Sequence, residues 1–206
     1  MHTLDNEALQ RSLQSHFQAS EQTAIPLFLN NDLILQVNGN RVPLRDKQMD
    51  EFYRGLIRDA REGAEVCGII YCMYWIRAEQ IMPLYFGKAE RYGKNGAISD
   101  NLTKPSFFGR WGYPKYYHMG DLGIGLRGGR KYQNWVERLF DSSTDLRLRS
   151  ETFFGAQLWT HNDHCSCGER ANVAALEACL IRHARRFWPN DNLNQKDGGP
   201  ACRCPS

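Results

Sequence analysis

Two tyrosines in the middle of the chain are the first residues whose types and spacing could do chemistry. Tyr71 and Tyr85 lie in two apolar runs, Cys67–Ile76 and Ile81–Phe86, whose short connection predicts an antiparallel β-hairpin. A turn centred on Ala78 puts the two tyrosines directly opposite one another, where cross-strand Cβ atoms lie roughly 5 Å apart. Two phenols on one face could orient a water and position a phosphate, or they could only pack against each other.

A lone carboxylate on an apolar helical stripe is the second candidate. Ser166–Trp188 has helical periodicity, opens with a capping-box pattern and stops before Pro189. Glu177 shares a stripe of this helix with mostly apolar residues. A carboxylate on a largely buried face is expected either to pair with a nearby arginine or to bind a metal ion. Both interpretations stay open.

The cysteines form a second constellation. Four of the seven make two Cys-x-Cys pairs, and two histidines lie just upstream of the first pair: Cys165, Cys167, Cys202, Cys204, His161 and His164. The N-terminus has no apolar segment typical of a secretory signal, so we expect a cytoplasmic protein, in which disulfides are disfavoured. The two hypotheses are a structural Zn²⁺ site and unliganded thiols.

The charge is modest in total but uneven along the chain. Lys and Arg number 26 against 23 Asp and Glu, yet residues 101–150 hold 9 basic and 4 acidic side chains. A basic segment rich in glycine and aromatic residues suits a surface that follows phosphates, although a solvated basic face explains it as well. The basic residues that we expect at DNA are Arg91, Lys115, Arg127, Arg130 and Lys131. The longest apolar run is too short to span a membrane.

The elements that would position these residues predict a single α+β domain. We expect a small mixed sheet built on the central hairpin and flanked by helices, with residues 1–64 as an N-terminal extension that holds DNA or packs, and residues 65–206 as the functional domain. Residues 87–130 read as one irregular segment. The other expected elements are helices at Glu7–Ala19, Asp50–Gly63 and Lys131–Phe140, a hairpin around Asn38-Gly39, and strands at Leu146–Phe154 and Ala156–Trp159.

The central hairpin and the later helix together resemble the GIY-YIG nuclease family. The two strands contain Gly68-Ile69-Ile70-Tyr71 and Tyr85-Phe86-Gly87-Lys88-Ala89, and the helix around Glu177 is followed by Pro189 and asparagines, as in that family. The first glycine lies three residues before the tyrosine rather than two, so either the glycine is shifted or the strand carries a bulge.

The resemblance implies a metal-dependent DNA endonuclease, most like the restriction-type branch of the family. Glu177 would hold Mg²⁺ or another divalent cation, Arg110 would grip the phosphate, and Tyr71 or His118 would take the proton from the attacking water. Arg91 competes with Arg110 for the phosphate. Tyr85 and Lys88 complete the expected catalytic group, and Asn194 or Asn192 would tether the glutamate helix to the hairpin.

Two other functions remain open at this stage. One is a non-specific or structure-specific DNase of the same family, such as a toxin or a repair nuclease. The other is a zinc-stabilised nucleic-acid-binding module whose hairpin tyrosines only stack bases. DNA is the expected partner in each case. A homodimer would suit palindromic cleavage, but nothing in the sequence demands one.

Overall fold

The computed structural model describes residues 6–17, 23–28, 46–93, 95–103, 137–141, 147–165 and 170–194, and the backbone of 34–37 and 40–43. Its centre is a sheet in the strand order β1-β6-β4-β5. The bounds of these strands are Ile25–Pro26 for β1, Val66–Arg77 for β4, Gln80–Glu90 for β5 and Phe153–Thr160 for β6. Each neighbouring pair is antiparallel. The α+β class and the central hairpin are therefore confirmed, whereas the expected mixture of parallel and antiparallel strands is wrong for the described sheet.

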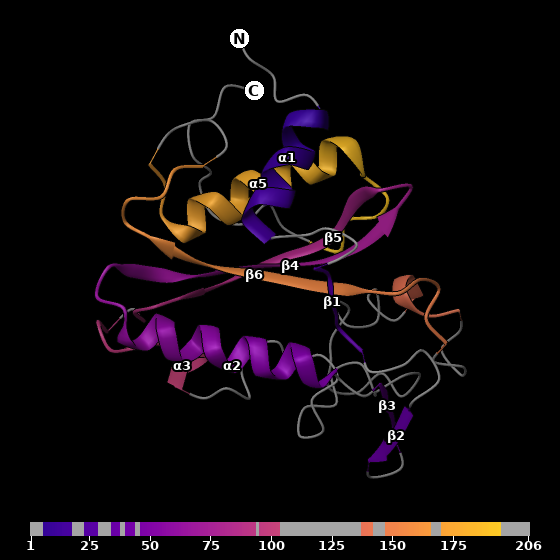
Figure 1. Ribbon diagram of the computed structural model, residues 1–206, viewed down its shortest axis with the longest axis horizontal. Coiled ribbons are helices and arrows are strands. Elements are labelled where there is room, and N and C mark those ends of the chain that lie inside the picture. The colour runs from indigo at the N-terminus through magenta and orange to yellow at the C-terminus, as the bar shows by residue number, and fades with distance from the viewer. Residues whose placement is uncertain are drawn as a thin grey trace.

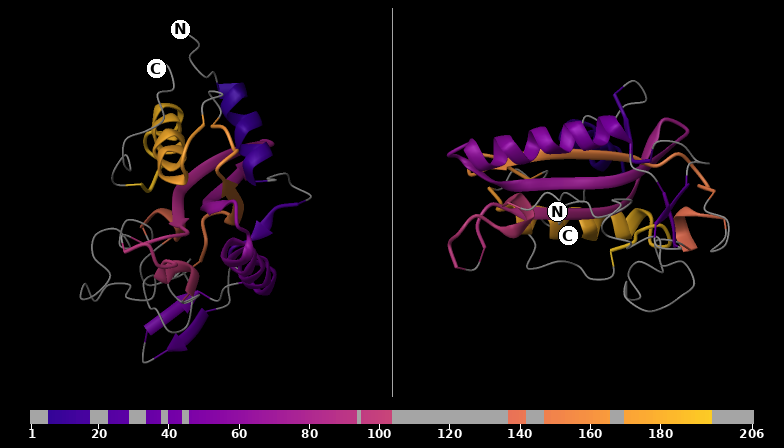
Figure 2. Two further views of the ribbon diagram at one scale, coloured as in Figure 1. Left: turned by 90° about the vertical axis from the view of Figure 1, so that its left-hand side faces the viewer. Right: turned by 90° about the horizontal axis from the view of Figure 1, so that it is seen from below.

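Helices cover both faces of the sheet (Figure 1). On one face lie α1 (Asn6–Phe17) and α5 (Val173–Phe187), and on the other lie α2 (Lys47–Glu62) and the short α3 (Asp100–Thr103). The two further views show the same arrangement, with α2 and α5 on opposite sides of the strands (Figure 2). No helix among the described residues is long and apolar enough to cross a bilayer.

The apolar alternation of β4 explains this two-sided packing. Ile69, Tyr71, Met73 and Trp75 belong to the core beneath α2. The alternate residues of the strand, such as Ile70, belong to the core shared with α1 and α5. Because successive side chains of a strand point to opposite faces, an unbroken apolar strand must be covered on both sides.

The N-terminal segment is part of the packing around this sheet. β1 pairs with β6, α1 contributes to one core, and α2 contributes to the other. Of the two roles considered for residues 1–64, packing is the one that these elements perform. The separate hairpin of β2 (Ile34–Val37) and β3 (Asn40–Pro43) also forms where it was expected.

Two helices begin at residues that satisfy their free backbone N–H groups. The side chain of Asp46 accepts a hydrogen bond from Gln48 N at the start of α2. Asn172 does the same for Ala175 N at the start of α5. Such N-caps stabilise a helix by about 1 kcal/mol. The expected start of the last helix at Ser166 is wrong, because α5 begins only after the Asn172 cap.

Two other expectations are corrected around the hairpin and its partner strand, and a third stays a prediction. β5 continues to Glu90, so its last four residues are not part of an irregular segment. Residues 153–160 form one strand that passes through Gly155 without a break. The helix expected over Lys131–Phe140 lies mostly outside the described residues, of which 137–139 are helical.

Candidate active site

The two tyrosines share one face of the hairpin, but they are not directly opposite each other. Tyr71 is paired with Gly87, and Tyr85 is paired with Met73. The rings are diagonal neighbours with centroids 6.4 Å apart and planes inclined by 40°. The expected direct pairing is wrong because the hairpin closes around two turn residues and then shifts register once more, between Met73 and Tyr74.

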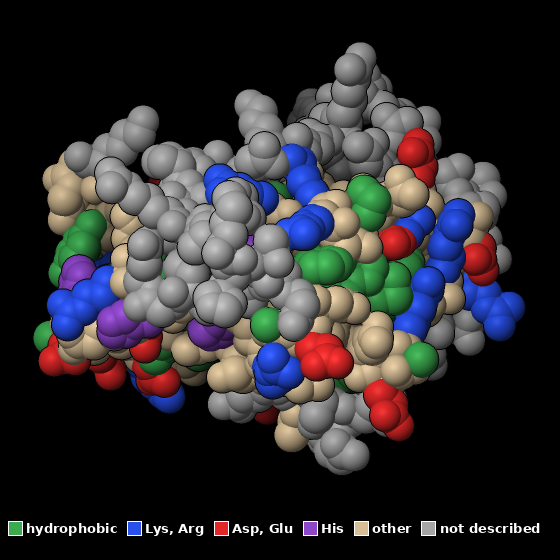
Figure 3. Space-filling view, turned by 90° about the horizontal axis from the view of Figure 1, so that it is seen from above, with side chains coloured by type: hydrophobic (Ala, Val, Ile, Leu, Met, Phe, Trp, Pro, Cys, Tyr) green, Lys and Arg blue, Asp and Glu red, His purple; other side chains and the backbone are tan. Residues whose placement is uncertain are grey.

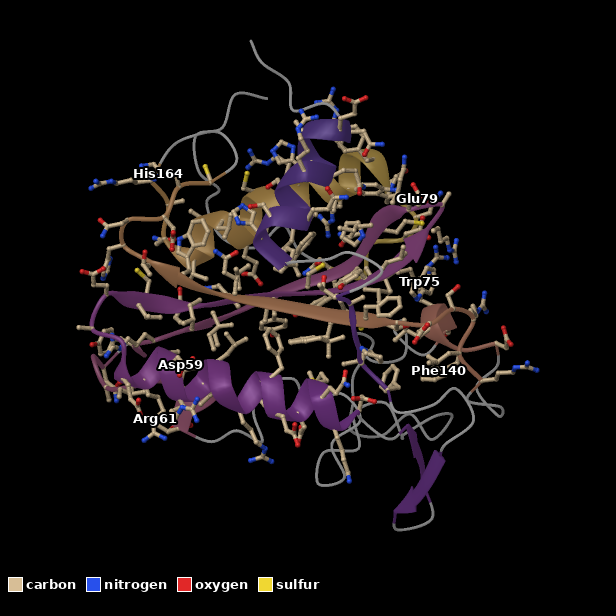
Figure 4. The ribbon with its side chains drawn as sticks, in the orientation of Figure 1. Asp59, Arg61, Trp75, Glu79, Phe140 and His164 are labelled. Atoms are coloured by element: carbon tan, nitrogen blue, oxygen red, sulfur yellow. The ribbon has the colours of Figure 1, made fainter. Side chains whose placement is uncertain are left out.

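The turn itself explains part of this register. Ala78 and Glu79 have φ values of 48° and 62°, the left-handed conformation that the tightest two-residue hairpin loops require. Arg77 is therefore paired with Gln80, and no single residue forms the centre of the turn. Figure 4 labels Glu79 at the tip of this hairpin.

The ring of Tyr71 is held by its neighbours on the sheet. It stacks on Phe154 of β6 at a centroid distance of 5.9 Å. It also lies directly over Gly87, where an added Cβ atom would come within 2.3 Å of the ring. Relative exposure is 9% for Tyr71 and 8% for Tyr85, so only a small part of each residue is open to solvent. The two tyrosines therefore form a rigid pair. Their hydroxyl groups, and not their buried ring faces, are suited to chemistry.

Gly68 has a different structural role from the tyrosines. It lies on the face of β4 that α5 covers, where an added Cβ would meet Ala89 O at 2.4 Å and Val173 Cγ1 at 3.2 Å. The pairing of β4 with β6 shifts register between Val66 and Gly68. This irregularity lies before Gly68, whereas the pairing from Gly68 to Tyr71 is regular, so the strand carries no bulge between the two residues and the glycine is shifted.

Glu177 and Lys88 belong to the opposite face of the sheet. Lys88 is paired with Ile70, which lies in the core shared with α5, and its Nζ is 2.7 Å from Glu90 Oε1. Glu177 is half-buried on α5. α5 packs mainly on the edge strand β5, so Glu177 lies on the face of the sheet opposite to the tyrosine pair.

Asn194 joins the segment after α5 to this same edge strand. Its Oδ1 accepts a hydrogen bond from Phe86 N at 2.9 Å, and its Nδ2 donates one to Phe86 O at 2.7 Å. Leu193 N donates to Leu84 O at 2.6 Å, and Arg185 donates to the carbonyl of Asn194. Asn194 therefore forms the tether between α5 and the hairpin. The side chain of Asn192 accepts from Asn194 N and supports it.

Arg91 has a structural role at the end of α2. Its guanidinium donates to the carbonyls at the end of α2 and just beyond it, including Arg61 O at 3.1 Å and Ala64 O at 3.0 Å. Further bonds reach the carbonyls of Gly63 and Val66, and Arg91 is only 8% exposed. A cation here satisfies carbonyls that the helix leaves unpaired. These contacts give Arg91 a structural role, and the expectation that it binds DNA or the scissile phosphate stays a prediction.

Several expected site residues lie outside the described part of the chain. They are Arg110, His118, Lys115, Arg127, Arg130, Lys131, Cys167, Cys202 and Cys204. Cys165 is described and is 3% exposed. Among the described residues, no three His, Cys, Asp or Glu side chains gather as a metal site. The zinc hypothesis stays a prediction.

Burial shifts the pKa of two described thiols and of His16. It raises the pKa of Cys72 well above the usual range and, with the charge of Asp163, also raises the pKa of Cys67. Such thiols remain protonated and poorly nucleophilic. Burial likewise lowers the pKa of His16, against a hydrogen bond to the side chain of Gln157 and the charge of Asp163, which raise it.

The sequence interpretation missed two parts of this site. One is the contact between Tyr71 and Gly87, for which the glycine itself was the available signal. The other is the group of arginines around Trp75 at the turn end of the same face. Comparison with family models, curated proteins and solved structures finds no match to this chain.

Proposed function

We propose that this chain is a metal-dependent nuclease of the GIY-YIG type that hydrolyses phosphodiester bonds in DNA. The observation that carries the proposal is the paired hydrogen bonding of Asn194 to Phe86. These bonds fasten the segment after the Glu177 helix to the strand that bears Tyr85 and Gly87. Three parts of the sequence resemblance, namely the hairpin, the helix and the asparagine, thereby belong to one rigid unit.

The residues fit one divalent cation with a single protein carboxylate. Mg²⁺ is commonly held by one or two carboxylates and keeps several of its waters, so Glu177 suffices as the protein ligand. When bound, such a cation supplies positive charge at the scissile phosphate and at the departing 3′ oxygen. Glu177 lies on a half-buried face of α5.

The chain's own residues then perform the proton transfer and the positioning. Tyr71, fixed by Phe154 and Gly87, orients the attacking water. The water's proton passes to Tyr71 as phenolate or to His118, the new P–O bond forms, and the bond to the 3′ oxygen breaks. Tyr85 positions the phosphate, and Arg110 offsets its added negative charge.

The burial of the tyrosine rings favours this function over a binding module that stacks bases. Stacking needs an exposed ring face, and Tyr71 and Tyr85 are only 9% and 8% exposed. A hydroxyl at the rim of a buried ring can still act on a phosphate. The restriction-type specificity and the non-specific alternative remain outcomes of the test.

A plasmid-cleavage assay with Mg²⁺ and with EDTA tests the proposal. Wild-type protein should cut only with the metal, and discrete bands would indicate site-specific cleavage whereas a smear would indicate a non-specific nuclease. Glu177→Gln should abolish cutting, and Tyr71→Phe should slow it by about 10²–10⁴-fold. Matched controls are Glu51→Gln on the exposed side of α2 and Tyr92→Phe, which is 53% exposed.

The controls make the outcome decisive. Both should cut at the wild-type rate, because both side chains are exposed to solvent rather than packed in the core. Wild-type protein that binds DNA but never cuts it would overturn the proposal and favour a binding module. Unchanged cutting by both Glu177→Gln and Tyr71→Phe would remove these residues from the active site.

A further inference from the structure

Arginine side chains surround the indole of Trp75, four residues beyond Tyr71 on the same face of β4. The guanidinium carbon of Arg77 lies 4.4 Å from the centroid of the indole, and that of Arg138 lies 5.6 Å from it. Arg149 is close enough for its charge to act on Arg138. We call these three residues the Trp75 arginine cluster. Figure 4 places Trp75 near the end of the sheet, with Phe140 beside it.

A buried scaffold holds the cluster in place. Trp75 is 1% exposed, and its indole N–H donates to Thr152 Oγ1 at 3.0 Å. Phe140 and Leu148 form an antiparallel bridge that brings their two segments together. On this bridge, Arg149 Nε donates to Phe140 O at 2.8 Å. The guanidinium groups are therefore presented by fixed backbone rather than by free loops.

The positive charge of the cluster is only partly balanced. Arg138 forms an ion pair with Asp191, but in the described part of the chain neither Arg77 nor Arg149 is paired with a carboxylate. Both are exposed residues. The Nε of Arg138 is buried and has no hydrogen-bond partner within the described ranges. Burial and the charges of Arg77 and Arg149 lower the pKa of Arg138, which means that its positive charge is disfavoured there.

An anion at this position would balance the charge of Arg77 and Arg149 and accept hydrogen bonds from their guanidinium groups. Guanidinium groups present several N–H donors in a planar fork that matches phosphate oxygens. Three of them beside a rigid aromatic platform favour a phosphate over a single compact ion. Because Asp191 pairs with Arg138, the charge of the cluster that stays available is that of Arg77 and Arg149, which suits one phosphate group.

We propose that the Trp75 arginine cluster binds a backbone phosphate of the nucleic-acid substrate, away from the bond that is cut. This inference rests on the proposed nuclease function. Four residues of strand separate Trp75 from Tyr71, or about 13 Å. At a rise of about 3.4 Å per nucleotide on one strand, the contacted phosphate lies roughly four nucleotides from the scissile one. The cluster therefore sets the register of the duplex relative to the tyrosine pair.

The same arginines could instead serve only to cover the indole with their aliphatic stems. Substitution by glutamine separates the two roles, since glutamine keeps part of the stem and a polar end but loses the charge. The test variant is Arg77→Gln/Arg149→Gln. Its matched control is Arg11→Gln/Arg182→Gln, which removes two charges from exposed residues of α1 and α5 on the other face. Figure 3 shows that basic and acidic side chains alternate on that face.

Binding of a labelled DNA duplex is measured by fluorescence anisotropy in EDTA, between about 50 and 200 mM salt. Arg77→Gln/Arg149→Gln should bind at least about five-fold more weakly and reduce the slope of log affinity against log salt by about one to two units. The control should keep the wild-type slope.

Arg77→Lys/Arg149→Lys should keep the slope but bind less tightly, because lysine retains charge without the fork. If the double variant fails to fold, Arg77→Gln alone should lower the slope by about one unit.

Cleavage by the same preparations with Mg²⁺ separates this inference from the proposed function. Wild-type protein that binds DNA through the cluster but does not cut would overturn the nuclease function and leave the phosphate site standing. Variants that cut and bind like wild-type protein would overturn the phosphate site and leave the nuclease standing. An equal loss of slope in the Arg11→Gln/Arg182→Gln control would also overturn it, because the effect would then be one of net charge.

Discussion

The ring of Tyr71 lies directly over the backbone of Gly87 on the neighbouring strand. A Cβ atom at Gly87 would approach the ring carbons and hydroxyl of Tyr71 to between 2.3 and 2.4 Å, which no real side chain tolerates. The glycine is required because a cross-strand aromatic ring occupies its place. This contact fixes the orientation of the phenol on which the proposed chemistry depends.

Gly87→Ala should therefore destabilise the protein and impair cleavage together. The methyl group must displace the Tyr71 ring from its stack on Phe154, an overpacking that costs about 1–3 kcal/mol. Urea unfolding measures the loss, and single-turnover cleavage should fall with it. The control is Gly55→Ala within α2, where an added Cβ meets nothing within 4 Å. That variant should gain about 0.5–1 kcal/mol from the better helix propensity of alanine.

A double-mutant cycle shows whether the ring is the cause. In a Tyr71→Ala background, Gly87→Ala should cost almost nothing, because the atoms that it strikes are absent. A penalty that persists in this background would mean that the strand backbone itself rejects the substitution.

Asn194→Ala should loosen the segment after α5 from the hairpin. The change leaves both the N–H and the carbonyl of Phe86 without their partners, at a cost of about 2–4 kcal/mol. Asn194→Asp should be at least as harmful, because a carboxylate oxygen would face the carbonyl oxygen. Asn192→Ala loses a single bond to Asn194 N and should cost about 1 kcal/mol. Hydrogen exchange of the Phe86 amide is the direct measurement. Protection of this amide in the three variants equal to that in wild-type protein would contradict the tether.

The sequence predicts that Tyr71 and Tyr85 share a face, but it does not predict which residues face them. The real turn and the register shift after Met73 together move the pairing by two residues. A shift of two preserves the face because side chains alternate with a period of two. The tyrosines therefore stay on one side while Gly87, rather than Tyr85, becomes the partner of Tyr71. Local patterns fix the face, whereas turn geometry and bulges fix the register.

Long-range contacts explain the expectations that the sequence could not settle. Arg91 follows the second tyrosine and looks available for phosphate, yet its carbonyl partners come from residues 61–66, more than twenty positions earlier. Asn192 fits a Pro-x-x-Asn spacing and Asn194 follows an apolar residue, and only the edge of β5 distinguishes them. In contrast, α1 and β4 follow from apolar periodicity alone and were predicted to within two residues.

Arg91→Ala should lower stability without changing the way the protein binds DNA. Four carbonyls at the end of α2 lose their donor, and we expect a loss of about 2–4 kcal/mol in the free energy of unfolding. Under conditions where the variant is folded, its salt slope for DNA should equal that of wild-type protein. Arg91→Lys should recover only part of the stability, since one ammonium cannot reach all four carbonyls. A reduced slope with unchanged stability would return Arg91 to the DNA interface.

Stability should fall on mild acidification because His183 is buried on α5. It is 7% exposed, and burial together with the charges of Arg182 and Arg186 lowers its pKa below the ordinary value of 6.5. The folded protein therefore binds fewer protons than the unfolded chain as the pH drops through about 6.5. Above about pH 6.5 His183 is neutral in both states and does not lower the free energy of unfolding. As the pH falls from there towards the lowered pKa, the unfolded chain takes up the proton first and the free energy of unfolding decreases.

His183→Gln should flatten this dependence, since glutamine cannot acquire the disfavoured charge. Urea unfolding from about pH 8 to about pH 5 measures the slope, with exposed His161→Gln as the control that should keep it. A remainder of the slope should persist in His183→Gln, because burial also lowers the pKa of His16. Combining His16→Gln with His183→Gln should remove that remainder, as the two residues lie on different helices and their effects should add. An unchanged slope in the double variant would mean that the acid sensitivity arises from carboxylates instead of from these buried imidazoles.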